Sequence, residues 1–165
     1  MVIGVPKEIK EQEFRVGLLP SAAYQLIKRG HRVVVETNAG AGSGYPDADY
    51  AQAGAEVVGS HEKVFAEADL IVKVKEPQAQ EIALLEPRHT LFTYLHLAPA
   101  PELTRGLMES GATCIAYETV ELPSRELPLL TPMSEVAGRM AVQEGAKYLE
   151  KLFGGRGVLL GGVPG

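Results

Sequence analysis

Short apolar runs alternate with amphipathic stretches along most of this chain. The runs have the length and β-branched content of strands, and they cover residues 2–5, 32–36, 70–75, 90–96 and 113–118. The stretches between them have helical spacing and cover residues 20–29, 46–53, 61–68, 78–85, 101–110 and 135–151. Residues 57–58 can form a small extra strand. This alternation predicts an α/β fold of the Rossmann-like or flavodoxin-like kind, an open, mostly parallel sheet with helices on both faces.

Residues at the helix boundaries support these assignments. Pro20 starts the first helix and Gly30 follows its end, which are the positions that these residue types favour. Ser134 is expected to cap the last helix, which would then run from Glu135 to about Lys151.

Length, charge and cysteine use narrow the class of protein. A chain of 165 residues suits one domain, and a domain of this size typically buries about 70% of its unfolded surface. The net charge is −5 and the basic residues are scattered, so nothing indicates nucleic-acid binding. No apolar run approaches the ~20 residues of a membrane span, and Met1 opens directly onto a strand. The single cysteine, Cys114, is expected to be a small buried side chain, and we expect a cytoplasmic protein.

Two other sequence patterns are weak indications of a binding site. The glycine-rich segment 40–44 follows a strand, but it lacks the third glycine of the dinucleotide fingerprint at the required spacing. His31, His61 and His89 lie apart, without cysteines or carboxylates at ligand spacing, so we expect no metal site.

Four strands are expected to end beside a side chain that can do chemistry. In chain order, these side chains are Arg15, Lys75, His96 and Glu118. Ligands of open parallel sheets bind outside the carboxyl ends of the strands, so all four would face one edge.

The residue types at this edge suggest a site for a small oxo or amino acid. Arg15 can hold a carboxylate through two hydrogen bonds, and Lys75 adds a point charge and a movable donor. His96 can exchange a proton with the substrate near neutral pH. Tyr94 and Glu118 are candidates for orienting these groups.

Each of these residues also has a structural alternative. Arg15 follows Glu11 and Glu13 in a charged loop, residues 6–15, that is expected to be too polar for a core, so it can be a solvated charge. Lys75 can extend from a strand end into water, and His96 can be a core histidine bonded to a backbone carbonyl. Lys73 is interpreted as a packing or salt-bridge residue.

Six blocks, in order along the chain, resemble the N-terminal portion of the alanine dehydrogenase family. They are residues 3–8, 15–20, 39–44, 73–77, 94–98 and 161–165. The resemblance covers essentially the whole chain. It implies an enzyme that oxidises L-alanine with NAD and water to pyruvate, ammonium and NADH, that also runs in reverse, and that usually forms hexamers.

The resemblance also implies roles for individual residues. The family residues that match Arg15 and Lys75 hold the substrate, and the one that matches His96 is the acid/base. The serine that matches Ser134 contacts the cofactor, and the methionine that matches Met133 lines the same cleft.

The family layout divides the chain into three parts. Residues 1–133 would form the substrate-binding catalytic domain, residues 134–153 a helix linking it to the NAD domain, and residues 154–165 the lead-in to a Rossmann domain outside this chain. The glycine-rich, uncapped end fits a fragment of a longer chain. We therefore expect the main NAD site to lie elsewhere and the fragment alone to show little or no activity.

Two other readings stay open at this point. The α subunit of nicotinamide nucleotide transhydrogenase shares the opening block and the layout, but its usual sequence lacks the residues seen here as Lys75 and His96, which favours the dehydrogenase. The third reading is a carboxylate-binding module without chemistry of its own.

Overall fold

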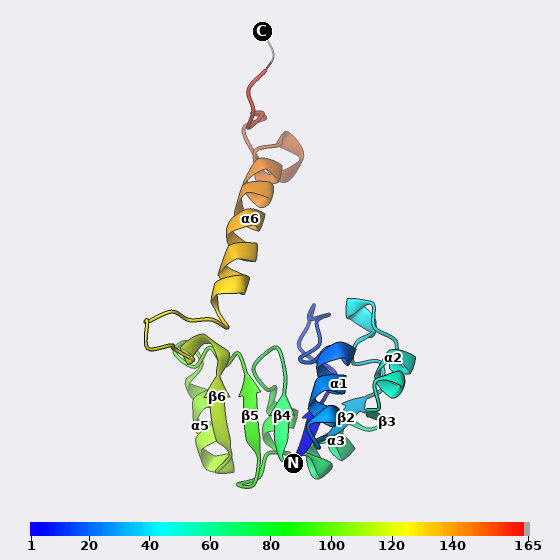
Figure 1. The fold of residues 1–165 in the computed structure, drawn as a ribbon. Helices are drawn as coiled ribbons and strands as arrows, with labels where there is room; N and C mark the ends of the chain where they lie inside the picture. The colour runs from blue at the N-terminus through cyan, green and yellow to red at the C-terminus, as the bar shows by residue number, and fades with distance from the viewer. Residues whose placement is uncertain (164–165) are drawn as a thin grey trace. The chain divides into compact units, whose positions relative to one another are not determined.

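A parallel sheet dominates the fold of the chain, whose residues 1–163 are described by a computed structural model. The sheet has six strands in the order β3-β2-β1-β4-β5-β6, and every neighbouring pair is parallel. Figure 1 shows these strands side by side. Their bounds are β1 Val2–Val5, β2 Arg32–Glu36, β3 Glu56–Val58, β4 Leu70–Val72, β5 Thr90–Thr93 and β6 Thr113–Ala116. The predicted α/β class is confirmed, and the short strand at 57–58 is part of the sheet.

Helices connect the strands, and one more helix, α6, follows the last strand in the sequence. Their bounds are α1 Pro20–Lys28, α2 Asp47–Gln52, α3 His61–Glu67, α4 Ala79–Ile82, α5 Pro101–Ser110 and α6 Thr131–Tyr148, with short 3₁₀ turns η1 Ala41–Ser43, η2 Tyr117–Thr119 and η3 Lys151–Phe153. The chain forms two compact units, residues 1–119 and the residues from Val120 onward. The whole sheet belongs to the first unit.

Both faces of the sheet in the first unit are covered, each by its own helices. On one face, Ile3 and Val35 pack with Ala23 of α1 and Tyr50 of α2. On the other face, the buried residues are Phe65 of α3, Leu107 of α5, and strand residues Ile71 and Leu91. Alternating strand residues point to opposite faces, so one strand supplies both layers. The prediction of helices on both faces is confirmed.

Three strands end earlier than the sequence predicts. β4 ends at Val72, β5 at Thr93 and β6 at Ala116, so Lys75, His96 and Glu118 lie just beyond the strand ends. After β4 and β5, carboxylates take backbone amides that a further ladder would use: Glu8 accepts from Val74 and Lys75, and Glu118 accepts from Leu95 and His96. β6 is followed directly by the 3₁₀ turn η2.

The expectation that the charged loop after β1 is too polar for a core is wrong at two positions. Pro6 and Glu8 are buried. The Glu8 carboxylate is tolerated there because it pairs with the ammonium of Lys73 and accepts backbone hydrogen bonds.

The second unit contains α6, and none of the side chains of this helix is buried. The prediction that Ser134 caps this helix is wrong, because the helix begins at Thr131 and Ser134 N–H donates to Leu130 O at 3.0 Å. Pro132 fits the first turn, where the N–H that proline lacks has no partner within the helix. The predicted division at residues 133 and 134 stays a prediction, and its last segment extends into residues 164–165, outside the described residues. None of the helices within residues 1–163 combines the length and the hydropathy that a membrane span requires.

Candidate functional site

The predicted site residues of the first unit lie at the carboxyl edge of four strands that are direct neighbours in the sheet. Arg15 lies in the loop after β1, Lys75 follows β4, His96 follows β5 and Glu118 lies in η2 after β6. Because these strands are parallel, their loops open toward the same edge. The shared edge predicted from sequence is therefore present.

Glu118 holds the backbone turn that carries His96. Its Oε1 accepts the His96 N–H at 2.7 Å and the Leu95 N–H at 3.1 Å. His96 has φ +50°, in the left-handed region that non-glycine residues seldom adopt, so its backbone is held against an intrinsic preference. Burial raises the pKa of the Glu118 carboxyl, but the backbone N–H groups and the nearby His96 outweigh burial and lower it.

The imidazole of His96 is exposed, so the alternative of a core histidine does not hold for it. That description fits His89, which is buried and lies before β5, at the opposite edge of the sheet. Its Nδ1 accepts the Glu86 N–H at 2.9 Å and its Nε2 lies 3.0 Å from the carbonyl oxygen of Phe65. Burial first, and the charge of Arg88 second, lower the pKa of His89.

The ring of Tyr94 lies close to the rings of His96 and Tyr117, which follow β5 and β6. Its ring centroid is 6.1 Å from that of His96 and 5.0 Å from that of Tyr117. Burial raises the pKa of Tyr94, the positive charge of Arg15 opposes this rise, and the negative charge of Glu118 adds to it. The phenol is therefore within electrostatic range of both Arg15 and Glu118.

Arg15 is engaged by a carboxylate of its own loop. Glu13 Oε1 accepts from the guanidinium Nε at 2.8 Å and Oε2 accepts from Nη2 at 2.6 Å, while the Arg15 side chain keeps 41% of its surface exposed. This pairing raises the pKa of Arg15 and lowers that of Glu13. The fork geometry that would suit a substrate carboxylate is therefore formed, with Glu13 in place of that carboxylate.

The backbone of Lys75 is fixed on both sides. Its N–H donates to Glu8 Oε1 at 3.3 Å, and its carbonyl oxygen accepts from the Thr93 hydroxyl at 2.9 Å. The charge of Lys75 lowers the pKa of Glu13, which places the ammonium in the electrostatic neighbourhood of the Arg15 loop.

Beneath this edge lies a row of buried charged side chains. The interpretation of Lys73 as a packing or salt-bridge residue is confirmed, but its partners were not predicted. Lys73 Nζ is 3.0 Å from Glu8 Oε2 and 2.7 Å from Glu81 Oε1, and the side chains of Lys73 and Glu81 are fully buried. His61 continues the row, with Nε2 3.3 Å from Glu81 Oε1 and Nδ1 2.7 Å from Glu36 Oε2. One signal was available: Lys73 is two residues after Ile71 and so shares its strand face, which is covered.

The side chains of this buried row stabilise one another's charges. Burial lowers the pKa of His61, but the hydrogen bond with Glu36 and the charges of Glu36 and Glu81 outweigh it and raise the pKa to about 9. Burial raises the pKa of Glu81, and the interactions with His61 and Lys73 outweigh this effect and lower it. Acidic and basic side chains therefore alternate along this row, which runs from Glu36 through His61, Glu81 and Lys73 to Glu8.

The predicted cofactor residues lie in the other compact unit. Met133 and Ser134 are both in the first turns of α6. Ser134 lines a hollow of about 500 Å³ together with residues such as Arg125 and Thr131. A hydroxyl there can donate to or accept from a bound polar group.

The glycine-rich loop after β2 does not provide a cradle for a pyrophosphate. A Cβ on Gly42 would lie 2.6 Å from the carbonyl oxygen of Phe14, and one on Gly40 would lie 2.7 Å from that of Tyr45. These glycines let backbone segments of this chain approach each other, so their faces are already occupied.

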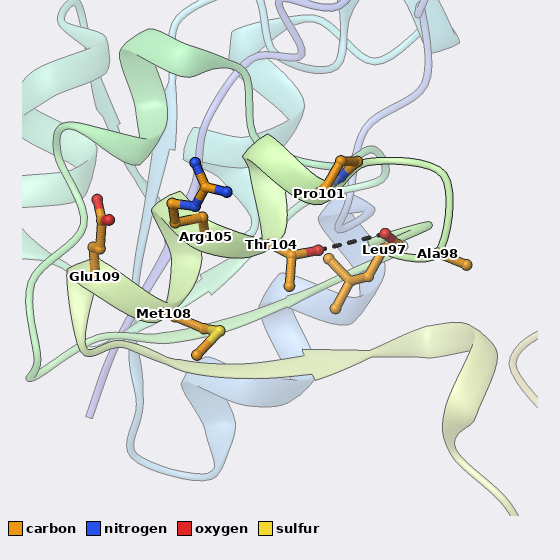
Figure 2. Close-up of a pocket in the computed structure, with 7 residues that line it drawn as sticks. All are labelled: Leu97, Ala98, Pro101, Thr104, Arg105, Met108 and Glu109. Atoms are coloured by element: carbon orange, nitrogen blue, oxygen red, sulfur yellow. Dashed lines mark hydrogen bonds between the residues drawn. The ribbon is translucent and has the colours of Figure 1, made fainter.

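Two hollows of the first unit lie near the edge. One, of about 340 Å³, runs between the loops that follow β1 and β2 and includes Glu8, Glu13 and Arg15 in its lining. The other, of about 700 Å³, lies beside α5, as Figure 2 shows, and its lining includes Leu97, the residue after His96 in the sequence. In Figure 2 the second hollow is bordered by Leu97 and Met108, with the Thr104 hydroxyl directed to the carbonyl oxygen of Leu97.

Comparison with known proteins relates the chain to one family. Residues 4–137 match the family model described as "Alanine dehydrogenase/PNT, N-terminal domain". The chain is 59% identical to the alanine dehydrogenase of Halomonas elongata and 55% identical to that of Methanococcus maripaludis, in both cases over all 165 residues. It is 56% identical to alanine dehydrogenase 2 of Staphylococcus aureus over the same length. The chain spans 44% of the length of each of these relatives.

Solved structures show the same relationship. An L-alanine dehydrogenase structure has a TM-score of 0.91 and 61% identity, over 99% of this chain and 45% of that chain. A transhydrogenase from Sinorhizobium meliloti has a TM-score of 0.67 and 31% identity, over 72% of this chain and 35% of that chain. The likeness to the dehydrogenase is therefore both closer and more extensive.

Proposed function

Since the chain belongs to the alanine dehydrogenase/PNT N-terminal domain family, we propose that it is the N-terminal, substrate-binding part of an NAD-dependent L-alanine dehydrogenase. The reaction is the reversible oxidative deamination of L-alanine to pyruvate and ammonium. The observation that carries the proposal is the common edge of β1, β4 and β5, from which the loops bearing Arg15, Lys75 and His96 extend.

Two cations of this edge would hold the substrate. The guanidinium of Arg15 would bind the carboxylate in the fork that Glu13 now occupies, so the substrate and Glu13 would compete for it. Lys75, whose backbone is fixed by Glu8 and Thr93, would direct its ammonium to the oxo group of pyruvate and polarise it.

His96 would move the protons. In the deamination direction it would accept a proton from the water that attacks the imine carbon and return a proton to the departing ammonia. Its exposed imidazole is consistent with access to a bound substrate, and the Glu118 carboxylate fixes the turn that carries it. When bound, the nicotinamide of NAD supplies the acceptor for the hydride from Cα.

The cofactor would be held mostly outside these residues. The occupied faces of Gly40 and Gly42 do not fit a pyrophosphate, whereas the Ser134 hydroxyl, at a hollow of the second unit, fits one polar contact with the cofactor. Met133, one residue earlier, would line the same cleft. The chain matches 44% of the length of its relatives, which supports an NAD domain in the part of those proteins that this chain does not match.

The cellular setting is part of the same proposal. We place the enzyme in the cytoplasm, because the single, half-buried Cys114 fits a reducing compartment. We expect a homo-oligomer of the hexameric kind that the family forms.

The decisive experiment is an assay of the full-length protein. Purified protein should form NADH from NAD only when L-alanine is added, and should consume NADH only when pyruvate and ammonium are both present. Hydride transfer between NADH and an oxidised nicotinamide analogue without alanine would instead support the transhydrogenase reading, which the lower identity of 31% makes the weaker one. Failure of both reactions, with pyruvate binding retained, would support a carboxylate-binding module.

A further inference from the structure

Lys73 is buried away from solvent between two carboxylates, and it lies two residues before Lys75. Its side chain has 0% exposure, and its ammonium contacts Glu8 at 3.0 Å and Glu81 at 2.7 Å. A buried ion pair of this kind is weak evidence for a gain in stability, because the cost of removing both charges from water offsets the attraction. The arrangement therefore calls for another explanation than stability.

The explanation lies in what the second oxygen of Glu8 does. While Oε2 pairs with Lys73, Oε1 accepts the Val74 N–H at 2.6 Å and the Lys75 N–H at 3.3 Å. The segment beyond β4 has no neighbouring strand on the β1 side at this point, because β1 ends at Val5. Glu8 therefore takes the place of a strand in fixing the backbone of Lys75.

The Glu8 carboxylate depends on Lys73 to stay where it is. The Glu8 side chain keeps only 2% of its surface exposed, and an unpaired carboxylate at such a site would become protonated or turn toward water. Lys73 is in turn fixed by Glu81, whose other oxygen accepts the Gln78 N–H at 2.7 Å. The order of dependence thus runs from Glu81 through Lys73 and Glu8 to Lys75.

We propose that Lys73 is a positioning residue for the substrate, acting through Glu8 to fix the backbone from which Lys75 reaches the substrate's oxo group. This inference rests on the proposed function, because it assigns a purpose to Lys75. Lys73 itself touches neither substrate nor cofactor.

The test is the substitution Lys73→Met in the full-length protein, assayed as pyruvate reduction with ammonium and NADH. Displacement of a substrate-binding group should raise the KM for pyruvate about tenfold or more. The KM for NADH should stay within about twofold of the wild-type value, since binding of NADH does not use Lys75. An unchanged KM for pyruvate would overturn the proposal.

A control variant separates positioning from loss of folded protein. His89→Leu removes a buried polar side chain with two partners at the opposite edge of the sheet. It should lower the Tm and the yield of active enzyme while leaving the KM for pyruvate unchanged. A rise in this KM as large as that of Lys73→Met would overturn the proposal, because any destabilisation would then produce it.

A second variant covers the case in which Lys73→Met does not fold. The double substitution Lys73→Met with Glu81→Leu removes the cation together with one of its two carboxylate partners, so that fewer buried charges lack a partner. The same rise in the KM for pyruvate is expected. An unchanged KM in this variant would also overturn the proposal.

Amide hydrogen exchange gives a readout that does not depend on the proposed function. If wild-type protein lacks alanine-dependent activity, the proposed function fails, and the geometric part of the inference is still tested. The amides of Val74 and Lys75 should exchange at least about tenfold faster in Lys73→Met than in His89→Leu, because their acceptor has moved. Equal exchange in the two variants would overturn the role assigned to Lys73.

Discussion

At the scale of single residues, the conformation of His96 depends on a side chain that follows another strand. The left-handed backbone of His96 directs the N–H groups of Leu95 and His96 to one carboxylate, that of Glu118. Hydrogen bonds from N–H groups to an ionised acceptor are among the stronger ones in proteins, so they can offset the cost of this conformation. Glu118 therefore holds the proposed acid/base in place without needing to react.

The role of Glu118 can be measured by comparing two substitutions in the full-length protein. Glu118→Ala removes both acceptor oxygens, and kcat should fall about tenfold or more because the His96 turn loses bonds of about 1.5–3 kcal/mol each. Glu118→Gln keeps one acceptor oxygen and should lie between wild type and Glu118→Ala. An unchanged kcat in Glu118→Ala would show that the turn does not need the carboxylate.

The role of His96 is best tested by a residue that tolerates its backbone. Asparagine adopts the left-handed region more readily than most residues, so His96→Asn should fold and keep its Tm. Its kcat should fall by about 10²–10⁴-fold if His96 is the acid/base. Activity near that of wild type, measured as alanine-dependent NADH formation, would exclude the role.

At the scale of elements, the closeness of helix and strand determines which positions tolerate a side chain. A Cβ on Gly4 of β1 would lie 2.7 Å from the Cβ of Ala68 and 2.9 Å from Val64 Cγ1. α3 and the residue after it thus approach β1 more closely than a side chain would allow. Gly138, inside α6, has open space at the same position.

These two glycines predict opposite effects of the same substitution. Gly4→Ala should lower the free energy of unfolding by about 1–3 kcal/mol, because the core must shift to accept a methyl group. Gly138→Ala should raise the stability of α6 by about 0.5–1 kcal/mol, because alanine is the better helix former. Urea titration measures the effect of Gly4→Ala, and the loss of helix content on heating measures the effect of Gly138→Ala. A neutral Gly4→Ala would show that α3 moves freely on the sheet.

The contact of α3 with β2 and α4 through His61 makes the stability of the sheet depend on pH. The pKa of His61 is raised from 6.5 to about 9 in the folded state, so the folded state holds a proton that the unfolded chain has lost. This stabilisation is complete below about pH 6.5 and disappears as pH rises through about 9.

Urea titrations at several pH values test this dependence. The free energy of unfolding of the wild type should fall by up to about 1.4 kcal/mol per pH unit across that window. His61→Gln should flatten the slope. A stability that is constant from pH 6.5 to 9 in the wild type would show that Glu36 and Glu81 do not hold the proton on His61.

The elements themselves were largely predictable from the sequence, because their signals are local. The proline of α1 and the glycine at position 111, with φ +70°, mark helix ends, and β-branched runs mark the strands. The strand ends were less predictable. An apolar alternation continues through Leu95, but Glu118, 23 residues away, ends the ladder by taking that residue's N–H.

At the scale of the whole molecule, the predicted edge followed from topology, but the charges beneath it did not. Alternation of strands and helices implies parallel strands, and parallel strands share an edge. The pairing of Lys73 with Glu8 joins residues 65 positions apart, and no periodicity in the sequence specifies it. The pairing of Arg15 with Glu13 is local, because the two residues are two positions apart in one charged loop, so the sequence makes it easier to predict.

The length of the chain relative to its relatives leads to a prediction about activity. The 165-residue chain with L-alanine and NAD should form no NADH above background, because it spans 44% of those relatives and its glycine loop does not fit a pyrophosphate. Calorimetric titration with pyruvate then asks whether the Arg15 fork binds a carboxylate by itself. Sustained NADH formation by the 165-residue chain would refute the proposed location of the cofactor site.

The strand order also has a consequence for biosynthesis. β1 has β2 on one side and β4 on the other, and the contact of Val2 with Asp69 spans 67 residues. On a ribosome that adds roughly 5–20 residues per second, β1 therefore waits on the order of seconds between gaining its first neighbour and its second. During that interval the nascent polypeptide presents an open hydrogen-bonding edge, which is a site where another chain can pair with it.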